Sequence, residues 1–201
     1  MKQQYLQFIG TMIPVLLGVY LAIVAGNYNE SVQQHRKLDR IEASLREEVA
    51  TNREAVQFSL DYHYGLRDSL MALRARYTEE GLSQIPPREV LSFFRGTRPA
   101  TIRYSAYQAG LATGLYPDME LDLLMSISDL YIRQENYASL TRSYLQQALG
   151  MTTDDMDGFE AVLFLSFFVN DIIPAEEALL RQMKAVEDYF DDEGGTTDLD
   201  G

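Results

Sequence analysis

The chain opens with a long apolar stretch that runs, with no intervening linker, into a charged pattern of helical period. No residue from Gln3 to Asn29 carries a charge, and the twenty residues 6–25 are apolar apart from Gln7 and Thr11. As one helix these twenty residues would be about 30 Å long, at about 1.5 Å per residue, which matches the hydrocarbon core of a bilayer. The pattern therefore predicts a transmembrane helix.

We expect residues 1–29 to form an uncleaved, single-pass membrane anchor. The alternative is a cleaved secretory signal, since Lys2 supplies a positive charge before the apolar run. The apolar part of such a signal is usually about 7–15 residues long, and this run is longer. Aromatic and amide side chains near its two ends are suited to the headgroup layer. The predicted membrane-interface residues are Tyr5, Asn27, Tyr28, Asn29 and Glu30.

Small or helix-bending residues recur within the apolar run at every fourth position. A step of four advances about 400° around a helix, so these positions form one slowly drifting stripe. Small side chains at this spacing let two membrane helices approach closely, and the sequence predicts a helix-docking face here. The face consists of Gly10, Pro14, Gly18, Ala22 and Gly26.

Beyond the anchor, apolar residues continue at spacings of three and four, which predicts an amphipathic stalk helix within 30–85. Asn52 and His63 fall on the same seam. A polar residue at a seam position can fix the register of a coiled coil, so a homodimer through the stalk is one possible assembly. The apolar seam residues are Val32, Leu38, Ile41, Leu45, Val49, Val56, Leu60, Leu66, Leu70 and Leu73.

The rest of the chain also has helical spacing, and the fold class that we predict is all-α, with a small helical bundle at 86–190. Proline at a first turn, glycine after a last turn and acids near a helix start set the expected boundaries. Asp118 is expected to cap the helix that begins at 119, and Pro174 is expected to begin the last helix. The expected helices are 86–94, 100–113, 119–145, 161–169 and 174–190.

Charge is concentrated at the C-terminal end of the chain. The net charge is −13, and residues 148–201 contain 14 acidic and two basic residues. Such a surface repels phosphate backbones, so we expect no nucleic-acid partner. The segment 191–201 is a polar, acidic tail of the kind that maintains solubility or meets a basic partner.

The sequence offers little for catalysis or for a cofactor. It has no cysteine, and His35 and His63 would lie about 42 Å apart on one straight helix, too far to share a metal ion. The acids Asp154, Asp155 and Asp157 do not fit a calcium loop, which needs a glutamate at its twelfth position. They fit better as helix-capping residues. We expect no metal, no cofactor and no enzymatic activity.

Two segments, "GVYLAIVAGNYNE" and "SAYQAGLATGLYPDMELDLLMSISDLY", carry a resemblance. The chain resembles a family of uncharacterised bacterial single-pass membrane proteins, in which a membrane helix ends in an Asn-Asn-Trp-Asn-Glu-like box and precedes a helical domain. Residues 27–30 resemble the box, with Tyr28 in place of tryptophan. The matching positions of the second segment are Ser105, Ala106, Tyr107, Gly114, Glu120 and Leu121.

The resemblance implies a bacterial inner membrane and favours a periplasmic domain. The basic residues Arg36, Lys37 and Arg40, set against Lys2 alone before the anchor, favour a cytoplasmic domain under the positive-inside rule. The sequence leaves both sides open.

Two functions of different class follow from these features. The first is a non-catalytic accessory or scaffold subunit of a bacterial membrane complex, which docks through its transmembrane helix onto integral membrane partners and braces them with the membrane-proximal domain. The alternative is a membrane-anchored sensor that holds a small ligand between helices near Tyr104, Tyr107, Tyr131 and Tyr137.

Overall fold

The structure is a computed structural model that describes the backbone of residues 2–150 and 156–194 and the side chains of 16–150 and 156–191. All regular structure in these residues is helical, as predicted, and no strand occurs among them. The elements are α1 (Lys2–Arg76), α2 (Glu79–Ser83), α3 (Pro87–Val90), α4 (Ser105–Thr113), the 3₁₀ turn η1 (Tyr116–Asp118), α5 (Leu121–Gly150) and α6 (Gly158–Gly194).

One helix, α1, joins the apolar N-terminal stretch to the domain without a break. It has 75 residues and is therefore about 110 Å long. It passes through Gly65 uninterrupted and ends at Arg76, earlier than the boundary of 85 that we expected. The following "EEGLS" forms the short helix α2 instead, because the Thr78 hydroxyl accepts a bond from the amide of Gly81 and starts a new turn.

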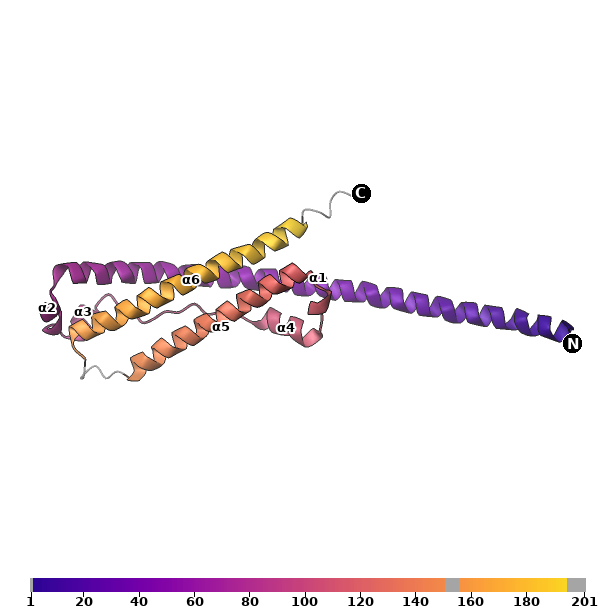
Figure 1. Cartoon of the computed structure of the whole chain (residues 1–201), viewed down its shortest axis with the longest axis horizontal. Helices are drawn as coiled ribbons and strands as arrows, with labels where there is room; N and C mark the ends of the chain where they lie inside the picture. The colour runs from indigo at the N-terminus through magenta and orange to yellow at the C-terminus, as the bar shows by residue number, and fades with distance from the viewer. Residues whose placement is uncertain (1, 151–155, 195–201) are drawn as a thin grey trace.

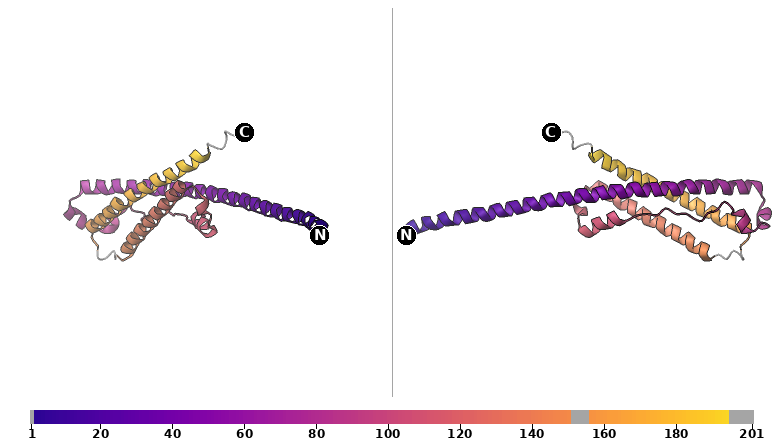
Figure 2. Two further views of the ribbon diagram at one scale, coloured as in Figure 1. Left: turned by 45° about the vertical axis from the view of Figure 1, so that its right-hand side comes forward. Right: turned by 180° about the vertical axis from the view of Figure 1, so that it is seen from behind.

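The second half of α1 is part of the bundle and not a free stalk. Helices α5 and α6 form a hairpin that crosses this half of α1, whereas the N-terminal half projects away from the domain (Figures 1 and 2). Helix α6 is the central element, since it packs against α1, α5, α2 and α3. Core side chains that are at most 1% exposed come from α1, α5 and α6, and include Leu45, Val49, Val56, Leu123, Ile127, Leu130, Leu165, Phe168, Ile172, Leu179, Met183 and Val186.

Among the residues searched, the stretch Gly158–Asp191 of α6 is long and apolar enough to cross a membrane. The same stretch supplies much of the core, and Val162, Leu165, Phe168 and Val169 are each 1% exposed. One face of α6 is thus used in packing against α1 and α5, whereas Phe167 on another face is 58% exposed.

The prediction that Pro174 opens a separate helix is wrong, since α6 is continuous through it. Proline lacks the N–H that would bond to the carbonyl of Asn170, four residues earlier. Asn170 is exposed, so solvent can bond that carbonyl. Buried side chains on both sides of the proline, Ile173 and Leu179 among them, hold the two halves in one helix.

The prediction of a helix over 100–113 is wrong in its first turn, because 100–104 is not helical and α4 begins at Ser105. Its C-terminus is confirmed, since Gly114 takes the left-handed conformation with φ of 67°. Asp118 does not cap the next helix. It ends η1, and the side-chain amide of Gln34 donates to its carboxylate over 2.6 Å. Likewise α3 stops at Val90, short of the expected 94.

The predicted capping role of Asp157 at the start of α6 is confirmed. The Glu160 amide donates to the Asp157 carboxylate (2.8 Å), and the Asp157 amide donates to the Glu160 carboxylate (3.1 Å), which together form a capping box. The bond from Glu160 lowers the pKa of Asp157 below its usual value. Asp154 and Asp155 lie outside the described residues.

Two glycines in helices give opposite predictions for stability. A Cβ on Gly158 would lie 2.4 Å from the carbonyl oxygen of Leu82 and 2.5 Å from that of Ile85, whereas a Cβ on Gly65 would meet nothing within 4 Å. Gly158→Ala should destabilise the domain by about 1–3 kcal/mol, since backbone must move. Gly65→Ala should stabilise it by up to about 1 kcal/mol. Thermal unfolding of both variants, followed by circular dichroism, checks this; equal melting temperatures would contradict the packing of α6 on α2.

Candidate functional site

The projecting part of α1 exposes apolar side chains that no described residue covers. Leu16 is 62% exposed, Tyr20 65% and Ile23 56%, although large apolar side chains are normally buried. A Cβ placed on Gly18 or on Gly26 would meet nothing within 4 Å. The bare part of the helix therefore presents both large apolar side chains and the small stripe between them to its surroundings.

The predicted docking stripe lies on this bare helix. Gly18, Ala22 and Gly26 are exposed. For Gly10 and Pro14 the structure gives the helical backbone alone, because their side chains fall outside the described residues. The stripe is therefore free of contacts with the domain wherever its side chains are described.

The predicted membrane-interface residues also lie outside the bundle. Asn27, Asn29 and Glu30 are exposed, and Tyr28 is 73% exposed. The side chain of Tyr5 falls outside the described residues. The helix passes through all four described interface residues without a break. These residues therefore lie within one continuous helix, and the backbone has no hinge at this point.

The bundle fixes this rod in place through a buried polar row on α1. Glu48, Asn52, Ser59 and His63 are each at most 5% exposed, and they lie on the face of α1 that meets the rest of the domain. We call these four residues the backbone clamp. They bond to the chain between Arg95 and Ala106, which crosses the bundle from α3 to α4. The part of this chain from 95 to 104, here called the connector, is not helical.

The connector runs antiparallel to α1, and side chains of α1 take the place of a partner strand. His63 Nε2 lies 2.7 Å from the carbonyl oxygen of Thr97, and Ser59 Oγ lies 2.9 Å from that of Arg98. Further along, Asn52 pairs with both backbone groups of Arg103: its amide donates to the carbonyl (2.9 Å), and its oxygen accepts from the N–H (2.8 Å). Backbone groups of Thr97, Arg98 and Arg103 thus find partners without a sheet.

Asn52 was expected to set the register of a homodimer, and its position corrects that interpretation. It is fully buried and bonds within its own chain. The apolar seam from Leu45 to Leu70 is covered by the other helices of the same chain. A homodimer through the stalk, which stays a prediction, would have to use α1 before Leu45.

At one end of the row, Glu48 caps α4 from a distance. Its carboxylate accepts bonds from the hydroxyl of Ser105 (2.8 Å), the amide of Ala106 (2.8 Å) and the hydroxyl of Tyr131 (2.5 Å). A negative charge at a helix N-terminus is favourable, since the first amides of the helix have no partners inside it. Burial, with Glu48 beside it, raises the pKa of Tyr131 well above the usual value.

At the other end of the clamp, His63 of α1 pairs with Glu176 of α6, and both side chains are 0% exposed. His63 Nδ1 lies 2.8 Å from one oxygen of Glu176, and the other oxygen is bonded to Ser59 and to Tyr137. Both ring nitrogens of His63 therefore lie against oxygen atoms, one of Glu176 and one of the Thr97 backbone. His63 was placed by the sequence on the seam of α1, and it is buried and hydrogen-bonded there.

This buried cluster contains the residue types of an acid–base pair but lacks an approach for a substrate. His63, Glu176 and Gln134 are 0% exposed, and Tyr137 is 2% exposed. The Tyr137 hydroxyl is also used structurally, since it accepts the amide of Ala100 over 2.8 Å. These hydrogen bonds join α1, α5, α6 and the connector to one another.

The tyrosines considered for a ligand site are packed against one another. Tyr107 stacks on Tyr131 with ring centroids 3.9 Å apart, and Tyr104 lies 6.1 Å from Tyr131. The hydroxyls of Tyr131 and Tyr137 bond to Glu48 and Glu176, as described above. These contacts favour core packing over ligand binding for the four rings.

Two open grooves lie elsewhere on the bundle. The larger, of about 580 Å³, lies between α1 and α6 and is lined by Arg53, Phe58, Arg181 and Lys184 among others. The smaller, of about 350 Å³, lies beside α4, and Glu48 forms part of its wall. In the part of the chain that the structure describes, no three His, Asp or Glu side chains are grouped closely enough to hold a metal ion.

Sequence reasoning missed most of the clamp. The signal was present in the spacing, because residues 48, 52, 59 and 63 are separated by four, seven and four and so share one helix face. What the sequence did not contain was the partner, since a side chain that bonds to the backbone of a distant loop leaves no pattern in that loop.

Removing one member of the clamp should be costly. Asn52→Ala would remove both hydrogen bonds to the backbone of Arg103, each of which contributes about 0.5–1.5 kcal/mol. It would also leave a void, because the Asn52 side chain is 0% exposed. The exposed Gln57, which bonds to Asp61 one turn along the same helix, provides the control. We expect urea unfolding to show a loss of at least about 2 kcal/mol for Asn52→Ala and less than about 0.5 kcal/mol for Gln57→Ala. Similar small losses for both would contradict the clamp.

Alkaline pH should destabilise the domain through its buried phenols. Burial, together with the bond to Asp171, raises the pKa of Tyr144 from 10.0 to about 12. Burial, with nearby Glu176, also raises the pKa of Tyr137. Because these pKa values are raised by folding, the stabilisation is complete below pH 10 and is lost as the pH rises through the folded pKa.

Ultraviolet absorbance of tyrosinate during an alkaline titration tests this. Exposed tyrosines should ionise near pH 10, and the buried ones should ionise together with the loss of helix, at higher pH. Ionisation of all tyrosines in one step near pH 10 with the helix intact would be inconsistent with the packing described here.

Comparisons of the chain with family models, with curated proteins and with solved structures returned no match.

Proposed function

We propose that this protein is a membrane-anchored, non-catalytic accessory or scaffold subunit of a bacterial membrane complex. The observation that carries the proposal is the bare apolar helix before the domain, of which Leu16, Tyr20 and Ile23 are more than half exposed. Transfer of one such side chain out of water contributes about 1.5–3 kcal/mol. Eight large apolar side chains between 16 and 28 are exposed in this way: Leu16, Leu17, Val19, Tyr20, Leu21, Ile23, Val24 and Tyr28.

Lipid is the medium that suits this surface. The uncharged run from Gln3 to Asn29 is long enough to span a hydrocarbon core, and its backbone is helical throughout. All backbone groups of a helix are bonded within the segment, as a membrane span requires. The inner membrane of a bacterium is the location that we propose, on the basis of the resemblance described above.

The small stripe supports a docking role within the membrane. Lipid provides no hydrophobic drive for helix association, so close packing at small residues supplies it. Gly18, Ala22 and Gly26 are the described positions at which a second helix could approach the backbone. An integral membrane protein is therefore the partner that we propose for this face.

The clamp supports a bracing role for the domain. A hydrogen-bonded row that joins Glu48 and His63 of α1 to α4, α6 and the connector makes the domain an extension of the anchor helix. A partner held by the anchor would find the domain at a fixed height and rotation. A scaffold needs this rigidity.

Substitutions on the stripe test the docking role. Gly18→Leu and Ala22→Leu keep the helix apolar, so membrane insertion should be unchanged, but each places a bulky side chain at the proposed contact. Val24→Leu lies on the opposite side of the helix and is the matched control. After mild-detergent extraction from the native membrane, mass spectrometry should find discrete partners with the parent chain and the control, and far less of them with the stripe variants.

Equal recovery of the same partners with Gly18→Leu, Ala22→Leu and the parent chain would remove the docking face from the proposal. Recovery of a lone monomer or homodimer from all variants would remove the scaffold role itself. Loss of partners with Val24→Leu as well would mean that the helix as a whole, and not the stripe, makes the contact.

A further inference from the structure

We propose that the corner formed by α4 and η1 rests on the surface of the lipid bilayer beside the anchor. The inference rests on the proposed membrane insertion of α1 and adds a second contact with the membrane, made by the domain. The observations behind it are the composition of the corner, its exposed side chains and its position along α1.

The corner carries the longest uncharged run of the chain after the apolar N-terminal stretch. From Tyr104 to Pro117 there are fourteen residues without Asp, Glu, Lys or Arg, bounded by Arg103 and Asp118. Because 23% of all residues in the chain are charged, an uncharged run of this length at an exposed turn calls for an explanation. Contact with an uncharged or mixed-charge layer provides one.

The tip of the corner is exposed and partly apolar. Leu111 is 55% exposed, and Ala112, Thr113, Gly114 and Pro117 are also exposed. The two large side chains that follow, Leu115 and Tyr116, turn inward and are at most 7% exposed. The Tyr116 hydroxyl donates to the carbonyl of Tyr107 over 2.7 Å and closes the turn. The corner is therefore a fixed, blunt knob and not a loose loop.

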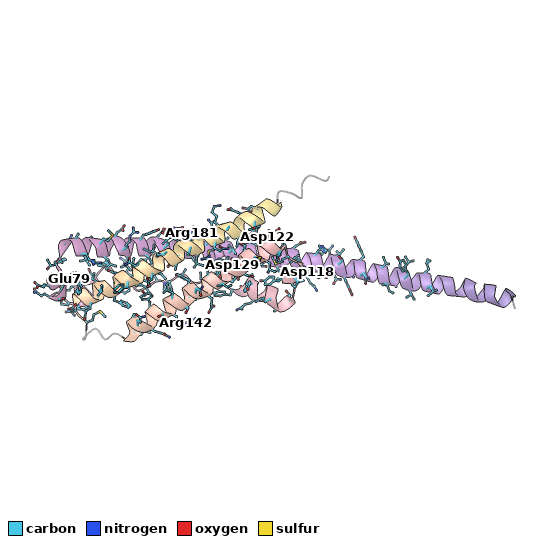
Figure 3. The ribbon with its side chains drawn as sticks, viewed as in Figure 1. Glu79, Asp118, Asp122, Asp129, Arg142 and Arg181 are labelled. Carbon is cyan, nitrogen blue, oxygen red and sulfur yellow. The ribbon has the colours of Figure 1, made fainter. Side chains whose placement is uncertain are left out.

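The corner also lies at the end of the bundle that faces the projecting half of α1. Figure 3 shows Asp118 at this end and Glu79 at the opposite one. The bond of 2.6 Å from Gln34 to Asp118 fixes the level of the corner along α1. Gln34 comes six residues after Tyr28, which is about 9 Å along the helix.

This level is close to the headgroups. Total bilayer thickness exceeds that of the hydrocarbon core by about 10–15 Å, which gives each headgroup layer about 5–8 Å. An uncharged run of 27 residues, from Gln3 to Asn29, is about 40 Å long and exceeds the core, so the helix is expected to tilt, by about 20° on average. A corner displaced about 10 Å sideways is lowered by about 3 Å when the tilt is toward it.

The shape of α1 favours a tilt in this direction. In Figure 1 and in both views of Figure 2, the N-terminal half of α1 inclines toward the side of the helix on which α4 lies. A bilayer set across this half is therefore brought nearer to the corner. The exposed basic residues Arg36, Lys37 and Arg40 lie at the same level as the corner along α1, where they can meet lipid phosphates.

Tryptophan fluorescence gives a direct test, because the chain contains no tryptophan. Three full-length variants are compared: Leu111→Trp at the corner, Leu21→Trp in the anchor and Met71→Trp at the far end of the bundle, where Met71 is 63% exposed. Each is purified alone and inserted into phosphatidylcholine vesicles. The vesicles carry either a nitroxide on the headgroup or bromine on the acyl chains, and both groups quench nearby tryptophan.

The proposal predicts that headgroup nitroxide quenches Leu111→Trp. It also predicts that the tryptophan emission of this variant in vesicles is blue-shifted relative to that of the same variant unfolded in denaturant. Bromine on the acyl chains should quench Leu21→Trp strongly, and neither group should quench Met71→Trp. Ala112→Trp, on the same tip, should behave as Leu111→Trp does and guards against a local effect of one substitution.

The experiment distinguishes failure of the corner contact from failure of the membrane anchor. Quenching of Leu21→Trp without quenching at either corner position would overturn the second contact and leave the anchor intact. Absence of quenching at Leu21→Trp would overturn the membrane anchor and the corner contact together. Since the vesicles hold no other protein, quenching at the corner would also show that lipid, and not the loop of a partner, is sufficient to cover it.

Discussion

The architecture depends on how the backbone of the connector, residues 95–104, is bonded to the helices. Ten residues cross the bundle in neither helix nor strand, so their N–H and carbonyl groups need partners outside regular secondary structure. Asn52, Ser59 and His63 meet this requirement from one face of α1, together with Tyr137 of α5. On the same face, Glu48 bonds to the first turn of α4, which follows the connector. The bonds specify the register between α1 and the connector, because a shift of one residue would break all of them.

That register has a consequence for the whole molecule. Helix α1 cannot rotate or slide within the bundle without losing the Asn52 and Glu48 bonds, and the same helix continues as the bare apolar segment. The bare apolar segment, the predicted interface residues around Tyr28 and the α4–η1 corner are therefore held at set positions along one helix. Scaffold function, as we propose it, follows from rigid geometry and needs no reactive group.

The sequence was sufficient to predict the class and the main axis of the fold. Hydrophobic spacing of three and four predicted an all-α chain, and the run from Val32 to Leu73 predicted the long helix that is observed. Gly114 predicted the end of α4, since only a residue without a side chain takes a φ of 67° easily. Local rules worked wherever the local backbone decided the outcome.

Local rules failed where a distant partner decided the outcome. Pro174 does not start a helix, because buried neighbours on both sides hold α6 together. Residues 100–104 were expected to be helical and are not, and the backbone of this stretch bonds instead to Asn52 of α1 and Tyr137 of α5. Asp118 bonds to Gln34 instead of capping α5. In each case tertiary contacts outweighed a preference of about 1 kcal/mol.

For the docking stripe, the sequence supplied the whole prediction. The structure adds that Gly18, Ala22 and Gly26 are not used within the chain. The integral membrane partner that we propose for this face is not identified by the spacing of small residues. The clamp is the reverse case, because its residues are hidden in an ordinary amphipathic seam and only the folded chain shows what they bind.

The central claim is that the anchor and the domain form one unbroken rod, and a distance measurement in a membrane tests it most directly. The chain has no cysteine, so spin labels can be attached at Tyr28→Cys and Met71→Cys, both at exposed positions. For a continuous helix, 43 residues correspond to about 65 Å. In lipid nanodiscs, pulsed electron paramagnetic resonance should give one narrow distance distribution near this value. A broad distribution, or one centred at a much shorter distance, would mean that a hinge separates the anchor from the domain and would contradict the account.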